Sequence, residues 1–569
     1  MNRKERRANR NRTGQESVAR APTATIRDLV AQAAMHQRDG RHRKAVRIFK
    51  EVIAREPGNA TAHDGIAMAY QALGSNDDAV LHFKEAIALG LLGVEALVKQ
   101  SPAVMAALGR LVSAWPRPLL LAALVGTKDS GSLGGEALLL ALLETRAVCD
   151  FELERLLTAI RRALLNGAFA ERGGATVHDW LGLACALAHQ CFINEYVFAL
   201  DGSERAQSQQ LIDRIVLALE SGADIAPAEL AVAGCYLPLH RLPLAVRLTE
   251  RPWSKTLDAL LTRQLREPLS EAADIAAIPV LTGIDDAVSR QVRDQYEENP
   301  YPRWTMPQPV RATTLDDFLH ERFGVAVTGL AGRDIMIAGC GTGEHSIQTA
   351  LRFPQAKILA VDINRNGLAY ARRRSREMGL ANIEYAVADI LKLGALDRRF
   401  DLIESVGVLH HLADPEAGWR VLLSLLRPGG VMRIGLYSER GRRQLDAARA
   451  LIAERGFRPT ADDIRVWRQE LFHRHQAIAS SDFFITSGCR DLCFNVMEHR
   501  FALPRIKAFL DANRLTVLGL EVPPEVRENF TQHNPEPAAA TDLDRWDAFE
   551  QAHPKAFEAM YFFWVRCST

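Results

Sequence analysis

The stretch IAGCGTGEHS, residues 337–346, places three glycines in a turn that directly follows an apolar run. Gly339, Gly341 and Gly343 have no side chain where the backbone must bend sharply and come close to a ligand, and glycine adopts a positive φ there without steric strain. A turn of this kind after a buried strand is typical of an α/β domain that binds a cofactor. The stretch therefore raises two questions, which cofactor it holds and for what reaction.

Short apolar segments around this turn are expected to be strands of one sheet. They are 334–338, 357–361, 383–387, 400–405 and 431–437, with a sixth within 505–522 and a last one at 560–566. Parallel strands buried on both faces are nearly continuous apolar runs. The segments between the first three are long enough for right-handed crossover helices. The pattern predicts an α/β domain from about residue 331 to 569, with an insertion at about 438–500.

The spacing of the glycines separates two classes of cofactor. A dinucleotide-binding turn has glycine at the third position of G-x-G-x-x-G, where the helix start faces a pyrophosphate. Counting from Gly339, this position is Glu344, whose carboxylate would repel a pyrophosphate. The turn therefore fits a cofactor without phosphate better. A nicotinamide-dependent oxidoreductase on a similar sheet is the alternative.

From about residue 330 to 437 the sequence resembles the class I S-adenosylmethionine-dependent methyltransferases, in particular the type 11/12 domain. The resemblance rests on GCGTG, on an acid after each of the next two strands, and on LLRPGGVMRIGLY, where Pro428, Gly429 and Gly430 would turn the chain into the fifth strand. It implies a Rossmann-like seven-stranded fold whose final strand inserts antiparallel, and S-adenosyl-L-methionine as the cofactor. The cofactor-binding residues that it implies are Gly339, Cys340, Gly341, Thr342, Gly343, Asp362, Ile363, Asp389, Ile390 and Ser405.

Two acids carry the main contacts to the cofactor that the resemblance implies. Asp362 follows the second strand, where its oxygens would accept hydrogen bonds from the ribose hydroxyls. Its alternative role is to cap the next helix. Asp389 follows the third strand and would accept from the adenine amine, with Ile363 and Ile390 against the faces of the ring.

The fourth strand ends in ESVGVLHHL, residues 404–412, and its tip faces the transferred methyl group in this fold. His410 or His411 is a candidate general base, because histidine titrates near neutrality. The alternative is that one histidine is packed and the other solvated. Tyr301, in the stretch YEENPYPRW, is a third catalytic candidate. Amino-methylating members of the family usually carry Asn/Asp-Pro-Pro-aromatic here, so oxygen or carbon is favoured over nitrogen as the acceptor atom.

The N-terminal part of the chain contains a repeat of 34 residues. The repeated residues are Gly40, Ala45 and Phe49, followed by Gly74, Ala79 and Phe83. This period belongs to tetratricopeptide repeats, so residues 22–93 resemble two such repeats. The resemblance implies a protein partner or a large substrate. A non-enzymatic tetratricopeptide adaptor with a degenerate methyltransferase domain is therefore a further alternative.

The remaining segments complete an expected multidomain chain. Residues 1–21 form a basic tail, which is expected to be disordered. Residues 94–283 have Ala- and Leu-rich helical periodicity and are expected to be all-helical. Residues 284–330 are expected to form a lid segment ahead of the methyltransferase domain.

Composition and charge exclude several functional classes. Lys and Arg total 70 against 69 Asp and Glu, so the net charge of +1 would not attract nucleic acid or a membrane surface. No apolar run reaches the ~20 residues of a membrane-spanning helix, and the basic start lacks the apolar segment of a secretory signal. A cytoplasmic location is expected. The eight cysteines lack framework spacing, and Cys489 and Cys493 with His499 are too few for a zinc site, so no disulfide and no metal are expected.

Overall fold

The structure is a computed structural model that describes residues 24–114, 117–126, 132–169, 180–324, 334–474 and 476–567. The basic tail predicted at 1–21 lies outside these residues. The chain divides into two compact units, 1–91 and 92–569. None of the described helices is long and apolar enough to cross a membrane.

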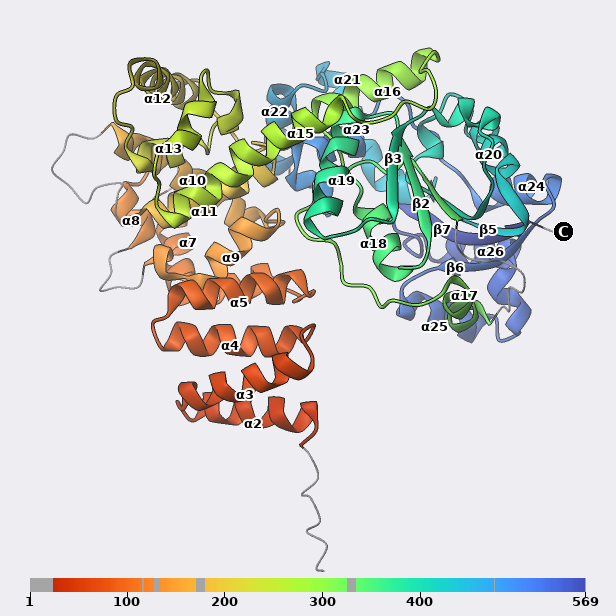
Figure 1. Ribbon diagram of the computed structural model, residues 1–569, viewed down its shortest axis with the longest axis horizontal. Coiled ribbons are helices and arrows are strands. Elements are labelled where there is room, and N and C mark those ends of the chain that lie inside the picture. Colours follow the sequence, from red (N-terminus) through yellow and green to blue (C-terminus); the bar gives the residue numbers. More distant parts are fainter. Residues whose placement is uncertain are drawn as a thin grey trace, which may run out of the picture. The chain divides into compact units, whose positions relative to one another are not determined.

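The first unit is a stack of four helices, each packed against the next in chain order (Figure 1). They are α2 (Ile26–Arg38), α3 (His42–Arg55), α4 (Ala60–Ala72) and α5 (Asn76–Ala88). Gly40 and Gly74 have φ values of 71° and 76°, so a left-handed residue ends the first helix of each pair. Phe49 and Phe83 occupy equivalent buried positions. The structure thus shows two similar helix pairs, and their assignment as tetratricopeptide repeats stays a prediction.

The second unit begins with the predicted all-helical region, which is confirmed. Its helices are α6 (Val94–Lys99), α7 (Pro102–Ala114), α8 (Leu121–Val125), α9 (Ala137–Thr145), α10 (Phe151–Ala168), α11 (Leu181–Ile193), α12 (Gly202–Ser221), α13 (Pro227–Ala233), α14 (Lys255–Leu261) and α15 (Glu267–Ile275). A π-helical turn joins α14 to α15. Within it the buried Gln264 amide donates to the carbonyls of Ala188 and Gly234 at 2.8 and 3.1 Å. This side chain ties three of the helices together.

A seven-stranded sheet follows, as predicted. The strands are β1 (Asp334–Ala338), β2 (Lys357–Asp362), β3 (Ile383–Val387), β4 (Phe400–Val406), β5 (Leu426–Tyr437), β6 (Leu515–Glu521) and β7 (Met560–Cys567). Their order is β3-β2-β1-β4-β5-β7-β6. Neighbouring strands pair in parallel from β3 to β5, and β7 runs antiparallel to both β5 and β6. The antiparallel insertion of the final strand is therefore confirmed.

The fifth strand differs from its prediction at its start. It begins at Leu426, so the Pro-Gly-Gly sequence lies inside the strand and not in a turn before it. The pairing with β4 shifts register between Phe400 and Leu402, and Gly429 has a φ of 72°. Extra residues and a left-handed glycine are the features of a bulge, which the sequence alone does not distinguish from a turn.

Helices cover both faces of the sheet, and each face has its own apolar core (Figure 1). One face carries α17 (Leu315–Phe323), α18 (Glu344–Arg352) and α19 (Arg365–Glu377), and the other carries α20 (Pro415–Ser424), α24 (Leu503–Ala512) and α26 (Leu543–Ala552). Ile335 on β1 belongs to the first core and Met336 to the second, because successive side chains of a strand point to opposite faces. On the second face Trp419 stacks on Phe509 with ring centroids 4.1 Å apart.

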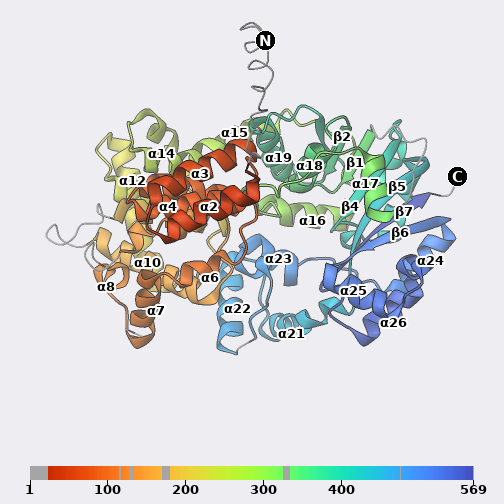
Figure 2. The same ribbon diagram turned by 90° about the horizontal axis from the view of Figure 1, so that it is seen from below.

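The predicted insertion contains α21 (Asp446–Arg455), α22 (Ala461–His473) and α23 (Thr486–Cys493), which lie together at one edge of the second unit (Figure 2). It is bound to the helical region through buried polar contacts. Arg468 on α22 makes a bidentate ion pair with Glu154 on α10, at 2.9 and 2.7 Å. Both side chains are almost fully buried, so each charge depends on the other.

The N-terminus of α23 is held by the same helical region. The backbone N–H of Ser487 donates to the Glu195 carboxylate at 2.6 Å, and the Thr486 hydroxyl donates to the Glu195 carbonyl at 2.9 Å. Glu195 has a φ of 56° just after α11. This contact fixes the position of α23, whose other end reaches the site described next.

Candidate active site

A cavity of about 420 Å³ lies at the carboxyl ends of the central strands. Strand order reverses between β1 and β4, and open α/β sheets bind their ligands at such a reversal. The lining comes from the glycine turn, from the ends of β2 to β5, from α16 (Ala287–Glu298) with the segment after it, and from α23. Ser289 and Met560, which are 271 residues apart in the sequence, therefore line the same cavity.

Glycine is required at two positions of the turn that faces the cavity. Gly339 has a φ of 81°, and a Cβ there would lie 2.3 Å from the Val408 side chain. Gly341 has a φ of 53°, and a Cβ there would lie 2.6 Å from the Tyr301 carbonyl oxygen. Both glycines and Cys340 between them line the cavity. A larger residue would close the space beside the turn.

The last two residues of GCGTG have other tasks. Thr342 is buried, its hydroxyl donates to the Pro302 carbonyl, and its own carbonyl accepts from Trp304 Nε1 at 3.1 Å. Gly343 packs against Ala371 of α19. A Cβ on Gly343 would lie 2.3 Å from the Cβ of Ala371. Neither residue lines the cavity. Thr342 holds the segment after α16 across the turn instead.

Asp389 offers a free hydrogen-bond acceptor to the cavity. Its side chain is fully buried, and Oδ1 accepts from the backbone N–H of Leu391 at 3.0 Å. Oδ2 is buried and has no hydrogen-bond partner within the described part of the chain. Both Asp389 and Ile390 line the cavity. A buried carboxylate oxygen without a donor is costly, so this geometry fits a ligand that supplies an N–H or O–H group.

Asp362 lies at the end of β2 and also lines the cavity, with Ile363 next to it. Its Oδ2 accepts from Gly341 N–H at 2.7 Å and its Oδ1 from Asn364 N–H at 2.8 Å. Burial raises the pKa of this carboxyl. Each oxygen keeps a second lone pair, so both can accept a further bond from a ligand hydroxyl. The N-cap of α19 is Asn364, so the capping role considered for Asp362 belongs to the residue two positions later.

Glu344 is the first residue of α18 and lines the cavity, as the glycine spacing suggested. Burial raises the pKa of this carboxyl. A carboxylate at the helix N-terminus occupies the place where a dinucleotide would put its pyrophosphate. The geometry therefore favours a cofactor without phosphate.

The end of β4 presents backbone and small side chains to the cavity. Val406 and Gly407 line it, whereas Ser405 is buried within the sheet and does not. Glu404 points to the side of α18, where it bonds His345. Burial raises the pKa of Glu404, but the charges of His345 and Arg433 outweigh burial and lower it to about 2.

The two adjacent histidines have different surroundings. His410 is fully buried, stacks on the Tyr437 ring at a centroid distance of 3.6 Å and accepts from Tyr437 N–H, and it does not line the cavity. His411 does line the cavity. Its Nδ1 lies 2.7 Å from the Met497 carbonyl oxygen, which can only accept, so Nδ1 carries the proton. Nε2 of His411 is then the nitrogen free to act as a base.

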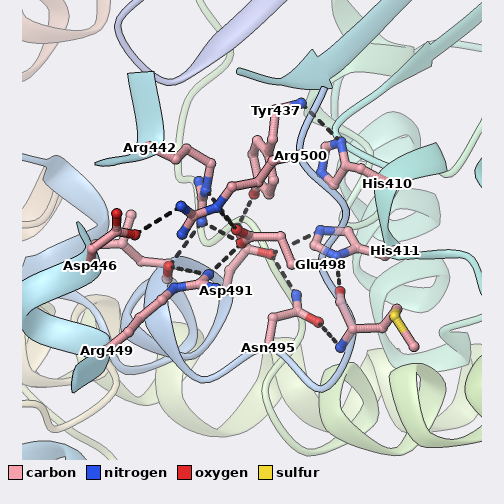
Figure 3. A network of polar contacts seen from close by, with 12 residues as sticks. His410, His411, Tyr437, Arg442, Asp446, Arg449, Asp491, Asn495, Glu498 and Arg500 are labelled. Carbon is pink, nitrogen blue, oxygen red and sulfur yellow. Dashed lines mark hydrogen bonds and ion pairs between the residues drawn. The ribbon is translucent and has the colours of Figure 1, made fainter. Parts of the chain in front are cut away.

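Residues of the lid segment and the insertion complete the cavity next to His411. Figure 3 shows Asp491 of α23 among Tyr437, Asn495 and His411. The Asp491 carboxylate accepts from the Tyr437 hydroxyl at 2.8 Å and from the Tyr296 hydroxyl at 2.6 Å. Tyr301 lines the cavity and donates to Asp482 at 3.2 Å.

Asp491 was not among the residues that the sequence singled out. The sequence predicts the insertion that contains it, but no motif marks this aspartate. Its place depends on how Glu195 holds the start of α23, which is a contact between residues far apart in the sequence. The stretch YEENPYPRW did indicate aromatic side chains at the site, and Tyr296 and Tyr301 both line the cavity.

Comparisons with known proteins agree with this geometry. Residues 332–465 match the family described as a methyltransferase domain. An uncharacterized protein of Synechococcus sp. is 32% identical over 256 residues, which cover 41% of this chain and 60% of that protein. Methyltransferase GfsG of Streptomyces halstedii is 29% identical over 174 residues, covering 27% of this chain and 61% of that protein. The chain thus spans about 60% of the length of each of these relatives.

The chain was also compared with solved structures. PKMT2 from Rickettsia typhi is 15% identical, with a TM-score of 0.35, over 44% of this chain and 52% of that one. The family match confirms the predicted methyltransferase domain and supports S-adenosylmethionine as its cofactor. Within the described residues, no group of three or more His, Cys, Asp or Glu side chains is arranged to hold a metal ion.

Proposed function

We propose that this chain is an S-adenosylmethionine-dependent methyltransferase and that oxygen or carbon is favoured over nitrogen as the methylated atom of its acceptor. The observation that carries the proposal is that the glycine turn, Asp362 and the partnerless oxygen of Asp389 line one cavity where the strand order reverses. In this assignment Asp389 accepts from the adenine amine and Asp362 from the ribose hydroxyls, with Ile363 and Ile390 beside the ring.

When S-adenosylmethionine is bound, it supplies a methyl group on a sulfonium. The rest of the cofactor leaves readily as a neutral thioether. The protein then has to align the acceptor in a closed cavity, and positioning of this kind supplies roughly 7–11 kcal/mol of barrier reduction. The segment with Tyr301 and Pro302 contributes by covering the glycine turn. Few catalytic side chains are needed beyond those that position the cofactor and the acceptor.

His411 is the proposed general base for the acceptor. Its Nδ1–H is fixed by the Met497 carbonyl, so Nε2 has a lone pair available in the cavity. Asp491 Oδ1 lies 3.7 Å from Nε2 and would stabilise the imidazolium that forms when the acceptor loses its proton. His410, the other candidate, uses its Nδ1 to accept from a backbone N–H and lies outside the cavity lining.

The pH dependence of kcat/KM should report His411. Burial lowers the pKa of His411 below its ordinary value of about 6.5, although Asp491 acts in the opposite direction. A base must be neutral, so we expect kcat/KM to be constant from neutral pH upward and to fall only as the pH drops through this lowered pKa. Initial rates of methyl transfer to acceptors in a cell extract, measured between pH 4.5 and 8, would show this. A decrease in rate centred above about pH 6.5 would exclude His411 as the base.

Calorimetric titration with S-adenosylhomocysteine and, separately, with NAD tests the proposal. We expect the first ligand to bind and the second not to bind, because Glu344 faces the cavity where a pyrophosphate would lie. NAD binding without S-adenosylhomocysteine binding would establish the oxidoreductase alternative. Binding of S-adenosylhomocysteine together with a lack of methyl transfer to any component of a cell extract would favour the adaptor alternative.

Two substitutions test the acids. Asp389→Asn replaces an acceptor oxygen by an amide that can face the same donor, and Asp362→Ala removes two acceptor oxygens. Each is expected to weaken S-adenosylhomocysteine binding by roughly 1–3 kcal/mol, the range for hydrogen bonds to a charged group. Calorimetry measures both, with Asp397→Asn in the exposed loop before β4 as the control. Unchanged dissociation constants would mean that the two acids do not contact the cofactor.

The N-terminal unit has a separate proposed role. Its two similar helix pairs, built on the 34-residue repeat, support a tetratricopeptide module that binds a protein partner or a large substrate.

A further inference from the structure

Two hydrogen-bond acceptors face each other in the cavity. His411 Nε2 lies 3.7 Å from Asp491 Oδ1, and both residues line the cavity. The neutral His411 ring carries its proton on Nδ1, because the Met497 carbonyl can only accept. Nε2 is buried and lacks a hydrogen-bond partner within the described residues. A spacing of 3.7 Å is too long for a direct hydrogen bond. His411 Nε2 is therefore open to a donor from a ligand, and Asp491 Oδ1, which already accepts from Tyr296 and Asn495, lies beside that position.

The Asp491 carboxylate is held firmly in this position. Tyr296 from α16 and Tyr437 from β5 donate to its two oxygens at 2.6 and 2.8 Å. Asn495 lies beside them and donates to the Tyr296 oxygen at 3.1 Å. The protein donors around Asp491 are therefore engaged with Asp491 itself or with each other. None of these hydroxyl protons is left for an anionic ligand.

The arginines near this position are engaged with an acid other than Asp491. The Arg442 guanidinium lies 3.6 Å from the centroid of the Tyr437 ring and binds both oxygens of Glu498, at 3.1 and 2.7 Å. Arg449 and Arg500 bind the same glutamate, as Figure 3 shows.

Two further ion pairs and one acid complete the electrostatics of this part of the cavity. Arg490 pairs with Glu298 at 3.0 Å, and Arg433, farther along β5, binds both oxygens of Glu521. Burial and the charge of Asp491 raise the pKa of Asp482, the acid bonded to Tyr301, to about 6. The charged group that faces His411 Nε2 directly, at 3.7 Å, is the Asp491 carboxylate.

Building on the proposed methyltransferase activity, we propose that the acceptor presents a hydrogen-bond donor, a hydroxyl or an amine, between His411 Nε2 and Asp491 Oδ1, and that Asp491 excludes carboxylate acceptors. We refer to these two atoms as the acceptor seat. A hydroxyl or amine gives its proton to Nε2 when its heteroatom is methylated, and the new Nε2–H faces Asp491. A carboxylate has no proton to give and would place a second negative charge beside Asp491.

The chemistry of the labelled product tests this proposal. The full chain is incubated with methyl-labelled S-adenosylmethionine and a heat-treated extract of the source cells, in which other transferases are inactive. Mild alkali releases methanol from methyl esters, hot hydriodic acid then releases methyl iodide from methyl ethers, and N-methyl products are collected as bases. We expect label in the ether or the N-methyl fraction. Alkali-released label, or label on carbon that resists every treatment, would overturn the proposal.

A second measurement needs no turnover and also separates the two donor types. Diethyl pyrocarbonate modifies neutral imidazole, and mass spectrometry reads the rate at His411 in protein loaded with S-adenosylhomocysteine. We expect phenol or benzylamine to slow this modification severalfold relative to that of the exposed His320 in the same sample, which corrects for reagent consumed by the amine. Benzoate at the same concentration should have no effect. Stronger protection by phenol would indicate a hydroxyl as the donor of the acceptor, and stronger protection by benzylamine would indicate an amine. Equal protection by benzoate would overturn the proposal. If no label is transferred in the first experiment, the proposed function fails. The protection experiment still tests whether the acceptor seat binds a hydroxyl or an amine and excludes a carboxylate.

Substitution of Asp491 isolates its contribution. In D491N the negative charge is lost, so benzoate should protect His411 as well as phenol does. D446N is the matched control, because Asp446 belongs to the same network through Arg500 but is exposed and away from the cavity. It should keep the preference for phenol. A D491N protein that still discriminates against benzoate would show that Asp491 does not select the acceptor. If D491N does not fold, the three-probe comparison on the unsubstituted protein decides.

Discussion

Gly341→Ala should lose S-adenosylhomocysteine binding in calorimetric titration. The new Cβ would lie 2.6 Å from the Tyr301 carbonyl oxygen, a backbone atom that cannot rotate away, and the residue would keep a φ of 53°. Either the turn or the segment over it must move. A strain of about 3 kcal/mol corresponds to binding that is weaker by about a hundredfold.

Gly379→Ala is the matched control for Gly341→Ala. Gly379 ends α19 with a φ of 68°, but a Cβ there would meet nothing within 4 Å. It should therefore lower the free energy of unfolding by about 1 kcal/mol without changing cofactor affinity. Equal loss of binding in both variants would mean that left-handed strain, and not contact with the lid segment, is responsible. Unchanged binding in Gly341→Ala would contradict the assignment of this turn.

His411→Gln should lower the rate of methyl transfer by roughly 10²–10⁴-fold, the usual contribution of a general base. Glutamine cannot take a proton at neutral pH. The affinity for S-adenosylhomocysteine should not change, because the acids assigned to the cofactor are untouched. Rates with a labelled methyl donor and calorimetry give the two quantities separately.

His410→Gln is the control for the adjacent position. His410 is packed against Tyr437 outside the cavity lining, so its replacement should affect stability more than rate. If His410→Gln lowers the rate as strongly as His411→Gln, the roles of the two histidines are wrongly divided. Normal turnover of His411→Gln would show that His411 is not a general base and that positioning of the acceptor is sufficient for the reaction.

The sheet could be predicted because its signal is local. Runs such as Ile335 to Ala338 are apolar throughout, as strands covered on both faces must be. The glycine turn could be predicted for the same reason, since a required positive φ restricts the residue at each position. The bulge at Gly429 could not, because a turn and a bulge use the same residue types.

The acceptor side of the site could not be predicted to the same degree. The acids after β2 and β3 follow directly from strand order, whereas Asp491 reaches the cavity through an interface between α23 and Glu195 that leaves no sequence pattern. The division of roles between His410 and His411 likewise depends on which ring meets Tyr437. Local sequence therefore specifies the side proposed for the cofactor, and tertiary contacts specify the side proposed for the acceptor.

The most direct test is a crystal structure of the protein with S-adenosylhomocysteine. We expect the ligand in the cavity, with the adenine amine within hydrogen-bond distance of Asp389 Oδ2 and the ribose hydroxyls at Asp362. A ligand bound elsewhere, or a cavity in which Asp389 Oδ2 bonds a protein group and the ligand is excluded, would contradict it.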